Sequence, residues 1–446
     1  MNRFSLKAVV TAFAAATLAA CTDAPVQPRT DADAALRPSL ARGQVGAEQV
    51  VPGDVVVRLK AGVDASAIAR EHGLAVKAQG PKNAFTVLAG AAGSERALAA
   101  RLGGDARVVY AQPNYIRQPS LIRPELWAFR NDGTLRVTFC CGDSRAGNVV
   151  NSLIPVADAD EDNVEGYAAA GSAVVIGSID SGVDLDHPEF VTNGVSRLIP
   201  GQNWVKGGPV LPEDVDGHGT HTTGTMAGNT VGVAGVSGAA PNVQVYVQRV
   251  CGNIGCFTTD IVSAIYAAAD YPGMVAMNIS IGGTSHSQIE QDAISYAVDT
   301  KKVLVIVSAG NGGTGTVSCP ACDEKAISVA ATDWRDEHAY YTNWGPGLDI
   351  SAPGGELYTN TTDQGGIYSA FLDGGYAYLQ GTSMAAPQVT GTAAIVASMT
   401  GLRGAALRDR ILSTTDDLGA RGYDTDFGSG RLNSYRAVVG KTLRER

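Results

Sequence analysis

The 446-residue chain contains no cluster of basic residues, and its formal net charge at pH 7 is −10. Surfaces that bind nucleic acid carry a positive patch that meets the phosphates, so this composition argues against nucleic acid as a partner. Glycine, in contrast, occurs 54 times, which together with several alanine-rich segments is typical of a tightly packed protein of helices and strands. A chain of this length exceeds a single hydrophobic core, and we expect at least two folded units.

The uncharged, mostly apolar stretch at residues 8–20 is too short to span a bilayer as a stable helix. Because basic residues precede it, we interpret residues 1–20 as a signal peptide. The stretch leads into Cys21 through Leu-Ala-Ala, which resembles a bacterial lipobox whose cysteine is acylated after cleavage. Ordinary signal-peptidase cleavage beside an incidental cysteine is the alternative. We expect an exported cell-envelope lipoprotein precursor, in which residues 21–50, with few large apolar side chains, form a flexible tether.

Three short motifs supply the side chains that a serine nucleophile needs. They place Asp180 before Ser-Gly-Val, His218 before Gly-Thr-His, and Ser383 between Gly-Thr and Met-Ala-Ala-Pro. A serine hydroxyl is a poor nucleophile near neutral pH unless an imidazole takes its proton and a carboxylate holds that imidazole. The Gly-x-Ser-x-Gly motif of α/β-hydrolases would need glycine where the chain has Ala385, so a lipase or esterase of that fold is disfavoured.

Each motif lies in a local context that suits its chemistry. Residues 174–179 are apolar and rich in β-branched side chains, which predicts a buried parallel strand ending at Asp180. The uncharged residues after Ser383 predict a buried helix, so the nucleophile would lie at a helix N-terminus, where backbone N–H groups favour developing negative charge. A second apolar strand, at 303–307, leads into Ser-Ala-Gly and then Asn311.

The order Asp, His, Ser and these contexts resemble those of the subtilisin-like serine peptidases, the subtilases. The resemblance implies that Asp180, His218 and Ser383 form the catalytic triad. It also implies that Asn311 donates its side-chain amide to the oxyanion, together with the backbone N–H of the nucleophile. Two extended edges would pair with the substrate backbone, and a third segment would form the far wall of the pocket; the residues implied are Gly252, Gly255, Cys256, Phe257, Ser280, Ile281, Gly282, Ser308, Ala309 and Gly310.

Residues 51–118 have a pattern of their own. Their strands and helices follow the order β-α-β-β-α-β, a ferredoxin-like arrangement, with strands expected at 54–59, 75–77, 84–88 and 108–115 and helices at 66–71 and 94–102. This region resembles the subtilase propeptide, which acts as an intramolecular chaperone and inhibitor. An unrelated small α+β domain is the alternative. The resemblance implies a self-processing precursor that is cut early in a linker at residues 119–149.

The catalytic domain is expected over residues 150–441. Apolar runs alternate here with helical patterns, which predicts an α/β fold whose mostly parallel sheet carries helices on both faces. The additional strands are expected at 243–250, 275–281 and 327–331, and the helices at 260–271 and 289–301.

Seven cysteines bear on export and metal binding. With Cys21 set aside for lipid, six cysteines remain, and they allow 15 pairings. In an exported protein we prefer two short-loop disulfides, Cys251 with Cys256 and Cys319 with Cys322. This preference leaves Cys140 and Cys141. Zinc at the Cys-x-x-Cys motif is disfavoured because no second pair of ligands lies nearby.

Calcium is the better candidate for a structural ion. The segment after His221 is shorter than in subtilisins with a tight calcium loop, which puts that site in doubt. A weaker site could use Asp349 with the carbonyl groups of Glu324 and Ala326. No cofactor is otherwise expected.

We therefore predict a serine endopeptidase that cleaves peptides or proteins through an acyl-enzyme and is made as a self-processing precursor. We expect a monomer that contacts the membrane only through lipid on Cys21, so that maturation releases the catalytic domain. The alternative is a surface-tethered binding or chaperone-like protein on an inactive peptidase scaffold. The presence of all three triad residues and Asn311 argues against it, because a decayed enzyme usually lacks at least one.

Overall fold

The structure is a computed structural model that describes residues 50–119, 171–229, 242–356 and 366–440. The predicted signal peptide, Cys21, nearly all of the tether, Cys140 and Cys141 lie outside these ranges. Within the described ranges, no helix combines the length and the apolar character that crossing a membrane requires.

A seven-stranded parallel sheet forms the centre of residues 171–440, with the order β16-β15-β14-β12-β5-β9-β8. Four of its central strands are buried at every residue, as their continuous apolar runs predict. Chain order reverses between β5 and β12, and open sheets bind ligands at the carboxyl ends of such strands. The strands are β5 (Val174–Asp180), β8 (Leu198–Asn203), β9 (Val243–Arg249), β12 (Met274–Ile279), β14 (Leu304–Ser308), β15 (Ile327–Thr332) and β16 (Ile350–Pro353).

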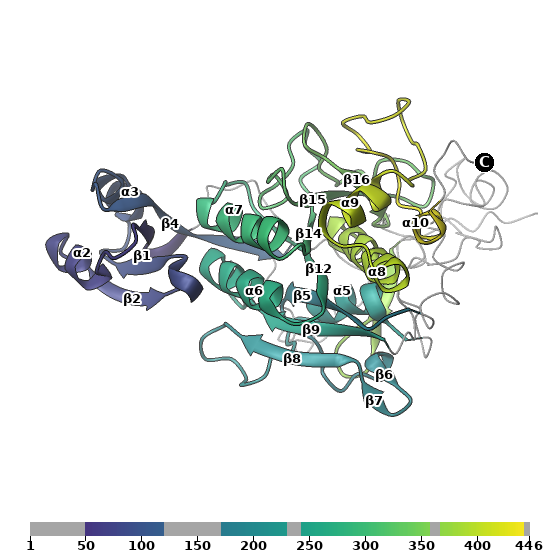
Figure 1. The fold of residues 1–446 in the computed structure, drawn as a ribbon, viewed down its shortest axis with the longest axis horizontal. Coiled ribbons are helices and arrows are strands. Elements are labelled where there is room, and N and C mark those ends of the chain that lie inside the picture. The colour runs from purple at the N-terminus through teal and green to yellow at the C-terminus, as the bar shows by residue number, and fades with distance from the viewer. Residues whose placement is uncertain (1–49, 120–170, 230–241, 357–365, 441–446) are drawn as a thin grey trace, which may run out of the picture. The chain divides into compact units, whose positions relative to one another are not determined.

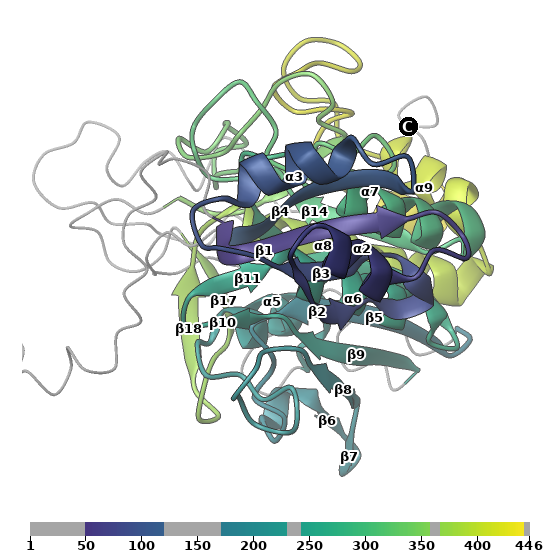
Figure 2. The same ribbon diagram turned by 90° about the vertical axis from the view of Figure 1, so that its left-hand side faces the viewer.

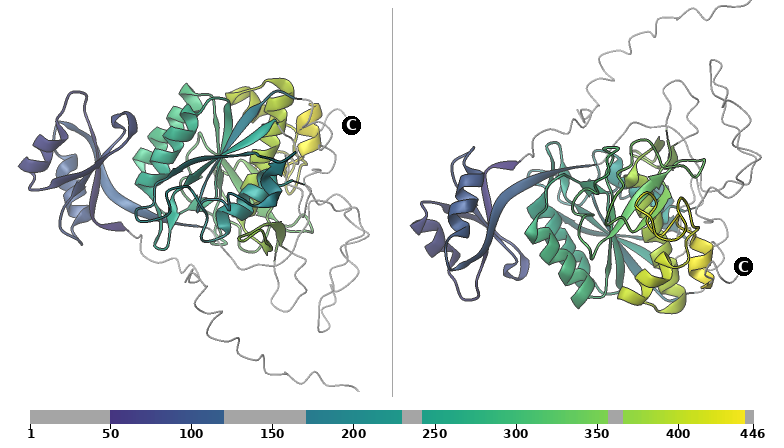
Figure 3. Two further views of the ribbon diagram at one scale, coloured as in Figure 1. Left: turned by 90° about the horizontal axis from the view of Figure 1, so that it is seen from below. Right: turned by 90° about the horizontal axis from the view of Figure 1, so that it is seen from above.

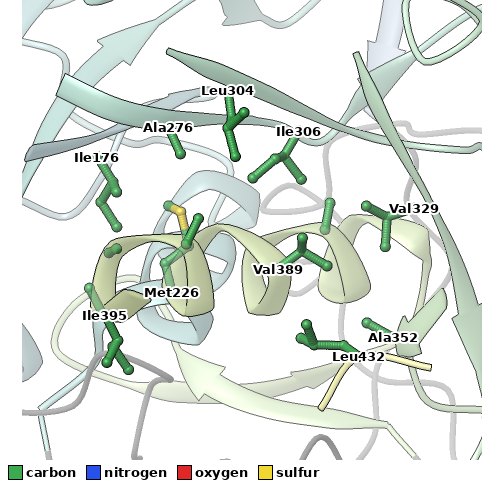
Figure 4. Packing of buried hydrophobic residues seen from close by; sticks show 14 of the residues in the cluster. Ile176, Met226, Ala276, Leu304, Ile306, Val329, Ala352, Val389, Ile395 and Leu432 are labelled. Atoms are coloured by element: carbon green, nitrogen blue, oxygen red, sulfur yellow. The ribbon is translucent and has the colours of Figure 1, made fainter. Parts of the chain in front are cut away.

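Helices cover both faces of this sheet (Figures 1 and 3), which confirms the predicted fold class. On one face lie α6 (Thr258–Asp270) and α7 (Gln288–Ser295). On the other face, α8 packs its apolar side chains against strands β5, β12, β14 and β15 (Figure 4). This second layer consists of α5 (His218–Ala227), α8 (Thr382–Thr400), α9 (Gly404–Leu412) and α10 (Ser434–Val439).

Smaller elements complete this region, and one of them corrects a prediction. The helix expected through residue 301 ends as an α-helix at Ser295 and continues as a π-turn over Tyr296–Thr300, because the N–H of Lys301 bonds to the carbonyl of Tyr296. Two short hairpins are formed by β6 (Val191–Thr192) with β7 (Val195–Ser196) and by β17 (Ile367–Ala370) with β18 (Tyr376–Leu379).

Residues 50–119 fold in the predicted β-α-β-β-α-β order, with an antiparallel sheet in the order β4-β1-β3-β2 (Figure 2). The ferredoxin-like pattern is therefore confirmed, although β4 continues four residues past its predicted end at residue 115. The elements are β1 (Val50–Leu59), α2 (Ala65–Glu71), β2 (Ala75–Gln79), β3 (Thr86–Ala89), α3 (Glu95–Gly103) and β4 (Val108–Pro119).

The two faces of this small sheet pack against different partners. Val55 and Val57 point toward α2 and α3 and form a cluster with side chains such as Leu102. Val56 and Val87, on the opposite face, belong to the apolar cluster that contains the side chains of α6 and α7. Both faces of the small sheet are therefore covered as long as residues 50–119 stay packed against α6 and α7.

Candidate active site

Asp180 and His218 form a buried pair at the carboxyl end of the parallel sheet. Asp180 is the last residue of β5 and His218 the first of α5, and they are 0% and 1% exposed. His218 Nδ1 lies 2.7 Å from Asp180 Oδ1. The carboxylate also accepts hydrogen bonds from the backbone N–H of Ser181 at 2.7 Å and from the hydroxyl of Thr222 at 3.3 Å. Because an ionised carboxylate only accepts, Nδ1 of His218 carries the proton and Nε2 is the basic nitrogen.

Close backbone packing brings these two residues together. A Cβ added at Gly219 would lie 2.1 Å from the carbonyl oxygen of Gly182 and 3.1 Å from Asp180 Cβ, so only glycine lets the first turn of α5 approach the end of β5. The loop before α5 is held by Asp214, whose carboxylate accepts hydrogen bonds from the backbone N–H of Thr220 at 2.9 Å and its hydroxyl at 2.6 Å.

The charges around His218 make it a stronger base. Burial alone lowers the pKa of His218, but attraction to Asp180 and the hydrogen bond with it raise that pKa, and the more distant Asp216 and Asp214 add to the effect. The net result is a pKa above the ordinary 6.5. Burial also raises the pKa of the Asp216 carboxyl.

Ser383 lies in the first turn of α8 and is 0% exposed. Its hydroxyl donates to the carbonyl oxygen of Ser280 at 3.3 Å, and the hydroxyl of Ser280 donates back to the carbonyl oxygen of Ser383 at 2.9 Å. Helices α5 and α8, which carry His218 and Ser383, pack against each other. Nε2 of His218 is buried without a hydrogen-bond partner in the described part of the chain. His218 Nε2 and Ser383 therefore share no hydrogen bond in this arrangement.

Asn311 is oriented by Thr382, the residue that precedes Ser383. Its Oδ1 accepts hydrogen bonds from the backbone N–H of Thr382 at 2.9 Å and from the Thr382 hydroxyl at 2.7 Å. An amide whose oxygen accepts both contacts donates through Nδ2. Sequence reasoning missed Thr382, although its position between Gly381 and Ser383 in the nucleophile motif was a signal that it lies beside the site.

Two of the three predicted substrate-binding segments lie along β4, the last strand of the small domain. β10 (Cys251–Gly252) and β11 (Gly255–Phe257) form a hairpin whose second strand pairs antiparallel with the end of β4. β13 (Ile281–Gly282), which directly follows Ser280, also pairs antiparallel with β4. An extended chain between two strand edges is the geometry in which a peptide is bound by β-augmentation. The third segment, Ser308, Ala309 and Gly310, connects the end of β14 to Asn311.

Both predicted disulfides are confirmed, and each braces one of these edges. Cys251–Cys256 closes the β10–β11 hairpin. Cys319–Cys322 lies beside the other edge, where Cys319 and Gly283 exchange backbone hydrogen bonds of 2.8 and 2.9 Å.

Comparison with known proteins identifies the family. The profile of the subtilase family matches residues 171–430, and that of the fervidolysin N-terminal prodomain matches residues 38–114. The chain belongs to the subtilase family of serine peptidases. A thermophilic serine proteinase of Bacillus sp. (strain AK1) is 32% identical over 399 residues, which cover 87% of this chain and 88% of that protein. Thermitase of Thermoactinomyces vulgaris is 34% identical over 271 residues, covering 60% and 90%.

Solved structures share the subtilase fold. Fervidolysin from Fervidobacterium pennivorans, described as a keratinolytic enzyme related to subtilisin, aligns with a TM-score of 0.67 at 22% identity over 89% of this chain and 62% of that chain. At this identity the likeness concerns the fold alone. The family prediction and the prodomain prediction are both confirmed.

A second histidine of this subtilase has a structural role. His221 Nε2 donates to the carbonyl oxygen of Ile367 at 2.9 Å, and burial lowers the pKa of His221 to about 3. The imidazole of His221 is therefore neutral near neutral pH, and its hydrogen bond to Ile367 connects α5 to β17.

The calcium prediction at Asp349, Glu324 and Ala326 does not fit the structure. Arg408 donates to the Asp349 carboxylate at 2.5 Å and to the carbonyl oxygen of Ala326 at 2.8 Å. The other carboxylate oxygen of Asp349 accepts from the N–H of Ser328 at 2.9 Å. A guanidinium group thus supplies the positive charge where the ion was expected, and it occupies the oxygens of Asp349 and Ala326 that would have bound calcium. No cluster of three or more metal-ligating side chains occurs within the described ranges.

Proposed function

We propose that this subtilase is an endopeptidase that uses Asp180, His218 and Ser383 as a catalytic triad. The observation that carries the proposal is the buried hydrogen bond between Asp180 and His218, which leaves Nε2 as the basic nitrogen. A buried, charge-paired imidazole beside a helix whose first turn carries a serine is the arrangement that nucleophilic acyl transfer needs.

The steps follow from these positions. Ser383 Oγ turns from the Ser280 carbonyl toward His218 and attacks the substrate carbonyl carbon, while Nε2 takes its proton. Asp180 stabilises the imidazolium that forms. Asn311 Nδ2 and the backbone N–H of Ser383 donate to the oxyanion. His218 then protonates the leaving amine, and a water molecule hydrolyses the acyl-enzyme by the same route in reverse.

We further propose that the protein is made as a self-processing precursor in which residues 51–118 act as chaperone and inhibitor. The supporting observation is the pairing of β4 with both β11 and β13, the two edges assigned to substrate. A strand held there blocks the cleft until it is cut and released.

Export and lipid attachment at Cys21 form a separate part of the proposal and rest on the signal-like N-terminus. Cys21 precedes the prodomain in the chain. A cut after the prodomain would therefore leave the lipid on the prodomain and release a monomeric catalytic domain. Labelled fatty acid should enter the precursor and be lost in Cys21→Ser; label on the mature domain would contradict this order.

The test of the peptidase proposal compares wild type with Ser383→Ala in a protease-deficient host. Wild type should shorten and hydrolyse a peptide substrate, whereas Ser383→Ala should accumulate uncut. Ser413→Ala, an exposed serine after α9, serves as the matched control and should behave like wild type. Equal processing of wild type and Ser383→Ala, with no hydrolysis by either, would favour a binding protein on an inactive scaffold.

A further inference from the structure

Asn311, the residue assigned to the oxyanion in the proposed mechanism, lies in a loop. Residues 309–318 follow β14 and form no helix or strand. Such a loop has no regular ladder of backbone hydrogen bonds, so its buried N–H and C=O groups need partners elsewhere in the chain. These partners decide where the loop holds the Asn311 side chain. An oxyanion donor contributes most when it is already in place before the reaction starts.

One buried residue, Asn343, holds this loop on both sides of Asn311. The backbone N–H of Asn343 donates to the carbonyl oxygen of Gly310 at 2.8 Å. Its side-chain Oδ1 accepts from the backbone N–H of Gly312, also at 2.8 Å. Asn343 is 4% exposed, so little water competes for these two bonds. The chain is thereby fixed immediately before and immediately after Asn311.

The amide of Asn343 is itself held in one orientation. Its Oδ1 also accepts from the backbone N–H and the hydroxyl of Thr314, each at 3.3 Å. Its Nδ2 donates to the hydroxyl oxygen of Ser318 at 3.0 Å. An amide oxygen accepts and an amide nitrogen donates, so these partners define which way the group points. The N–H of Ser318 donates in turn to the carbonyl oxygen of Ala309 at 2.8 Å, which joins the two ends of the loop.

The backbone passes so close to this amide that a side chain does not fit between them. A Cβ added at Gly310, where φ is +104°, would lie 2.5 Å from Nδ2 of Asn343. A Cβ added at Gly312 would lie 3.1 Å from Oδ1 of Asn343. The two glycines that flank Asn311 therefore let the loop pack directly on Asn343.

Asn343 and Thr382 fix different parts of Asn311. Thr382 donates to the side-chain oxygen of Asn311, whereas Asn343 holds the backbone from which that side chain extends. Asn343 lies in the segment between β15 and β16, and Thr382 is the first residue of α8. Loss of the Asn343 side chain would leave the Thr382 contacts but release the loop around them.

We propose that Asn343 is a positioning residue for catalysis that acts through Asn311. The inference rests on the proposed function, because it concerns the oxyanion donor of that mechanism. Asn343 holds Gly310 and Gly312 in place, so that Nδ2 of Asn311 points to where the substrate oxygen becomes negative. Without the Asn343 side chain the loop leaves this position for most of the time. The transition state then loses stabilisation, while binding of the substrate ground state changes little.

The first experiment is a double-mutant cycle on kcat in the mature enzyme, with Asn343→Ala, Asn311→Leu and the two changes combined. Titration with a fluorophosphonate counts the active sites, so that a misfolded fraction does not lower the measured rate. Asn343→Ala should lower kcat about tenfold with KM little changed, the effect of one net hydrogen bond. In the Asn311→Leu enzyme the same change should cost almost nothing more. If the two losses multiplied, Asn343 would act elsewhere and the proposal would be wrong.

A matched control separates positioning from stability. Asn433 is also a buried asparagine whose Oδ1 accepts a backbone N–H, that of Arg436 at 2.9 Å, but it caps α10 outside the proposed site. Asn343→Ala and Asn433→Ala should both lower the melting temperature, and only Asn343→Ala should lower kcat. An Asn343→Ala enzyme that is destabilised but keeps the kcat of wild type would overturn the proposal, because the residue would then be only structural.

A milder variant covers the case in which Asn343→Ala does not fold. Asn343→Ser retains a polar side chain, but its hydroxyl ends one bond short of the Oδ1 position that reaches Gly312. This variant should also lower kcat, and the loss should disappear in the Asn311→Leu enzyme. A folded Asn343→Ser enzyme with the kcat of wild type would contradict the proposal.

The same measurements separate this inference from the function on which it rests. If Asn311→Leu lowers kcat and Asn343→Ala does not, the inference fails and the proposed mechanism stands. If Asn311→Leu leaves kcat unchanged, the oxyanion assignment fails and the inference fails with it. Hydrolysis that does not depend on Ser383 would refute the peptidase mechanism itself.

Discussion

Strand β12 of the catalytic region is buried at every residue, whereas strand β2 of the prodomain is exposed at every residue. The parallel sheet has helices of its own on both faces, so it needs no other part of the chain to cover it. The prodomain sheet has its own helices on one face only, and its other face packs on α6 and α7. The difference shows that the catalytic region covers both faces of its sheet with its own helices. The prodomain covers the second face of its sheet only by packing against α6 and α7 of the catalytic region.

The polar contacts of the docked face show how the prodomain is positioned. Gln112 donates to the hydroxyl of Ser287, the N-cap of α7, at 2.9 Å and accepts from the backbone N–H of Gln288 at 2.9 Å. It thereby satisfies a backbone donor that the first turn of the helix leaves unpaired. Arg58 and Tyr110 both donate to Asp292 of α7, at 2.7 and 2.8 Å. The pair of Arg58 with Asp292 is partly exposed and contributes little.

The largest expected effect lies wholly in the catalytic region. His218→Ala should lower kcat on the order of 10⁶-fold, the loss measured in subtilisin, and adding Ser383→Ala should cost almost nothing more because the two side chains act as a unit. Steady-state hydrolysis of a chromogenic peptide measures this, with the prodomain supplied as a separate chain so that folding is not the variable. If the two losses multiplied, the two residues would act independently.

The second effect separates the proposed oxyanion donor, Asn311, from the proposed triad. Asn311→Leu should lower kcat by roughly 10²- to 10³-fold, as removal of an oxyanion-hole donor does in subtilisin, with KM little changed. The reason is that the Nδ2 bond strengthens only when the carbonyl oxygen becomes negative. A raised KM with an intact kcat would instead make Asn311 a residue that binds the substrate ground state.

The third effect lies in the prodomain and tests its docking. Gln112→Ala removes two hydrogen bonds to the start of α7, so inhibition of the mature enzyme by the added prodomain should weaken about tenfold. Gln79→Ala, at an exposed position on β2, is the matched control and should inhibit like wild type. Equal inhibition constants for all three prodomains would show that the capping contact does not hold the prodomain.

The smallest effect is a shift in pH dependence. His218 accepts a proton only when neutral, so kcat/KM should fall as pH drops through a pKa that its surroundings raise above 6.5. Asp216→Asn removes one of the negative charges that raise this pKa, so the acidic limb should move to lower pH. Asp409→Asn, exposed on α9, should leave the limb in place. A limb that moved to higher pH in Asp216→Asn would contradict the assigned electrostatics.

Much of the scaffold could be predicted because its signals are local. The runs that form β5 and β14 are continuous and apolar, and the uncharged stretch after Ser383 forms a buried helix, α8. The spacing of Cys251 and Cys256 suits a hairpin disulfide. These features depend on residues close in sequence, and periodicity and spacing report them directly.

The parts that could not be predicted depend on residues far apart in sequence. Arg408 is 59 residues from Asp349, so nothing near Asp349 indicates that its charge is already matched. Gln112 caps a helix that starts more than 170 residues later in the chain. The orientation of Asn311 by Thr382 is likewise set by tertiary packing. Such pairings emerge only when the fold brings the partners together.

The most direct test of the central claim, that Ser383 is a nucleophile activated by His218, is covalent labelling of the mature enzyme with a fluorophosphonate. The reagent reacts with a serine whose proton an imidazole removes, so peptide mass spectrometry should find one label per chain, on Ser383, and none in His218→Ala. Label on a different serine, or no label in an enzyme that still hydrolyses peptides, would contradict the account.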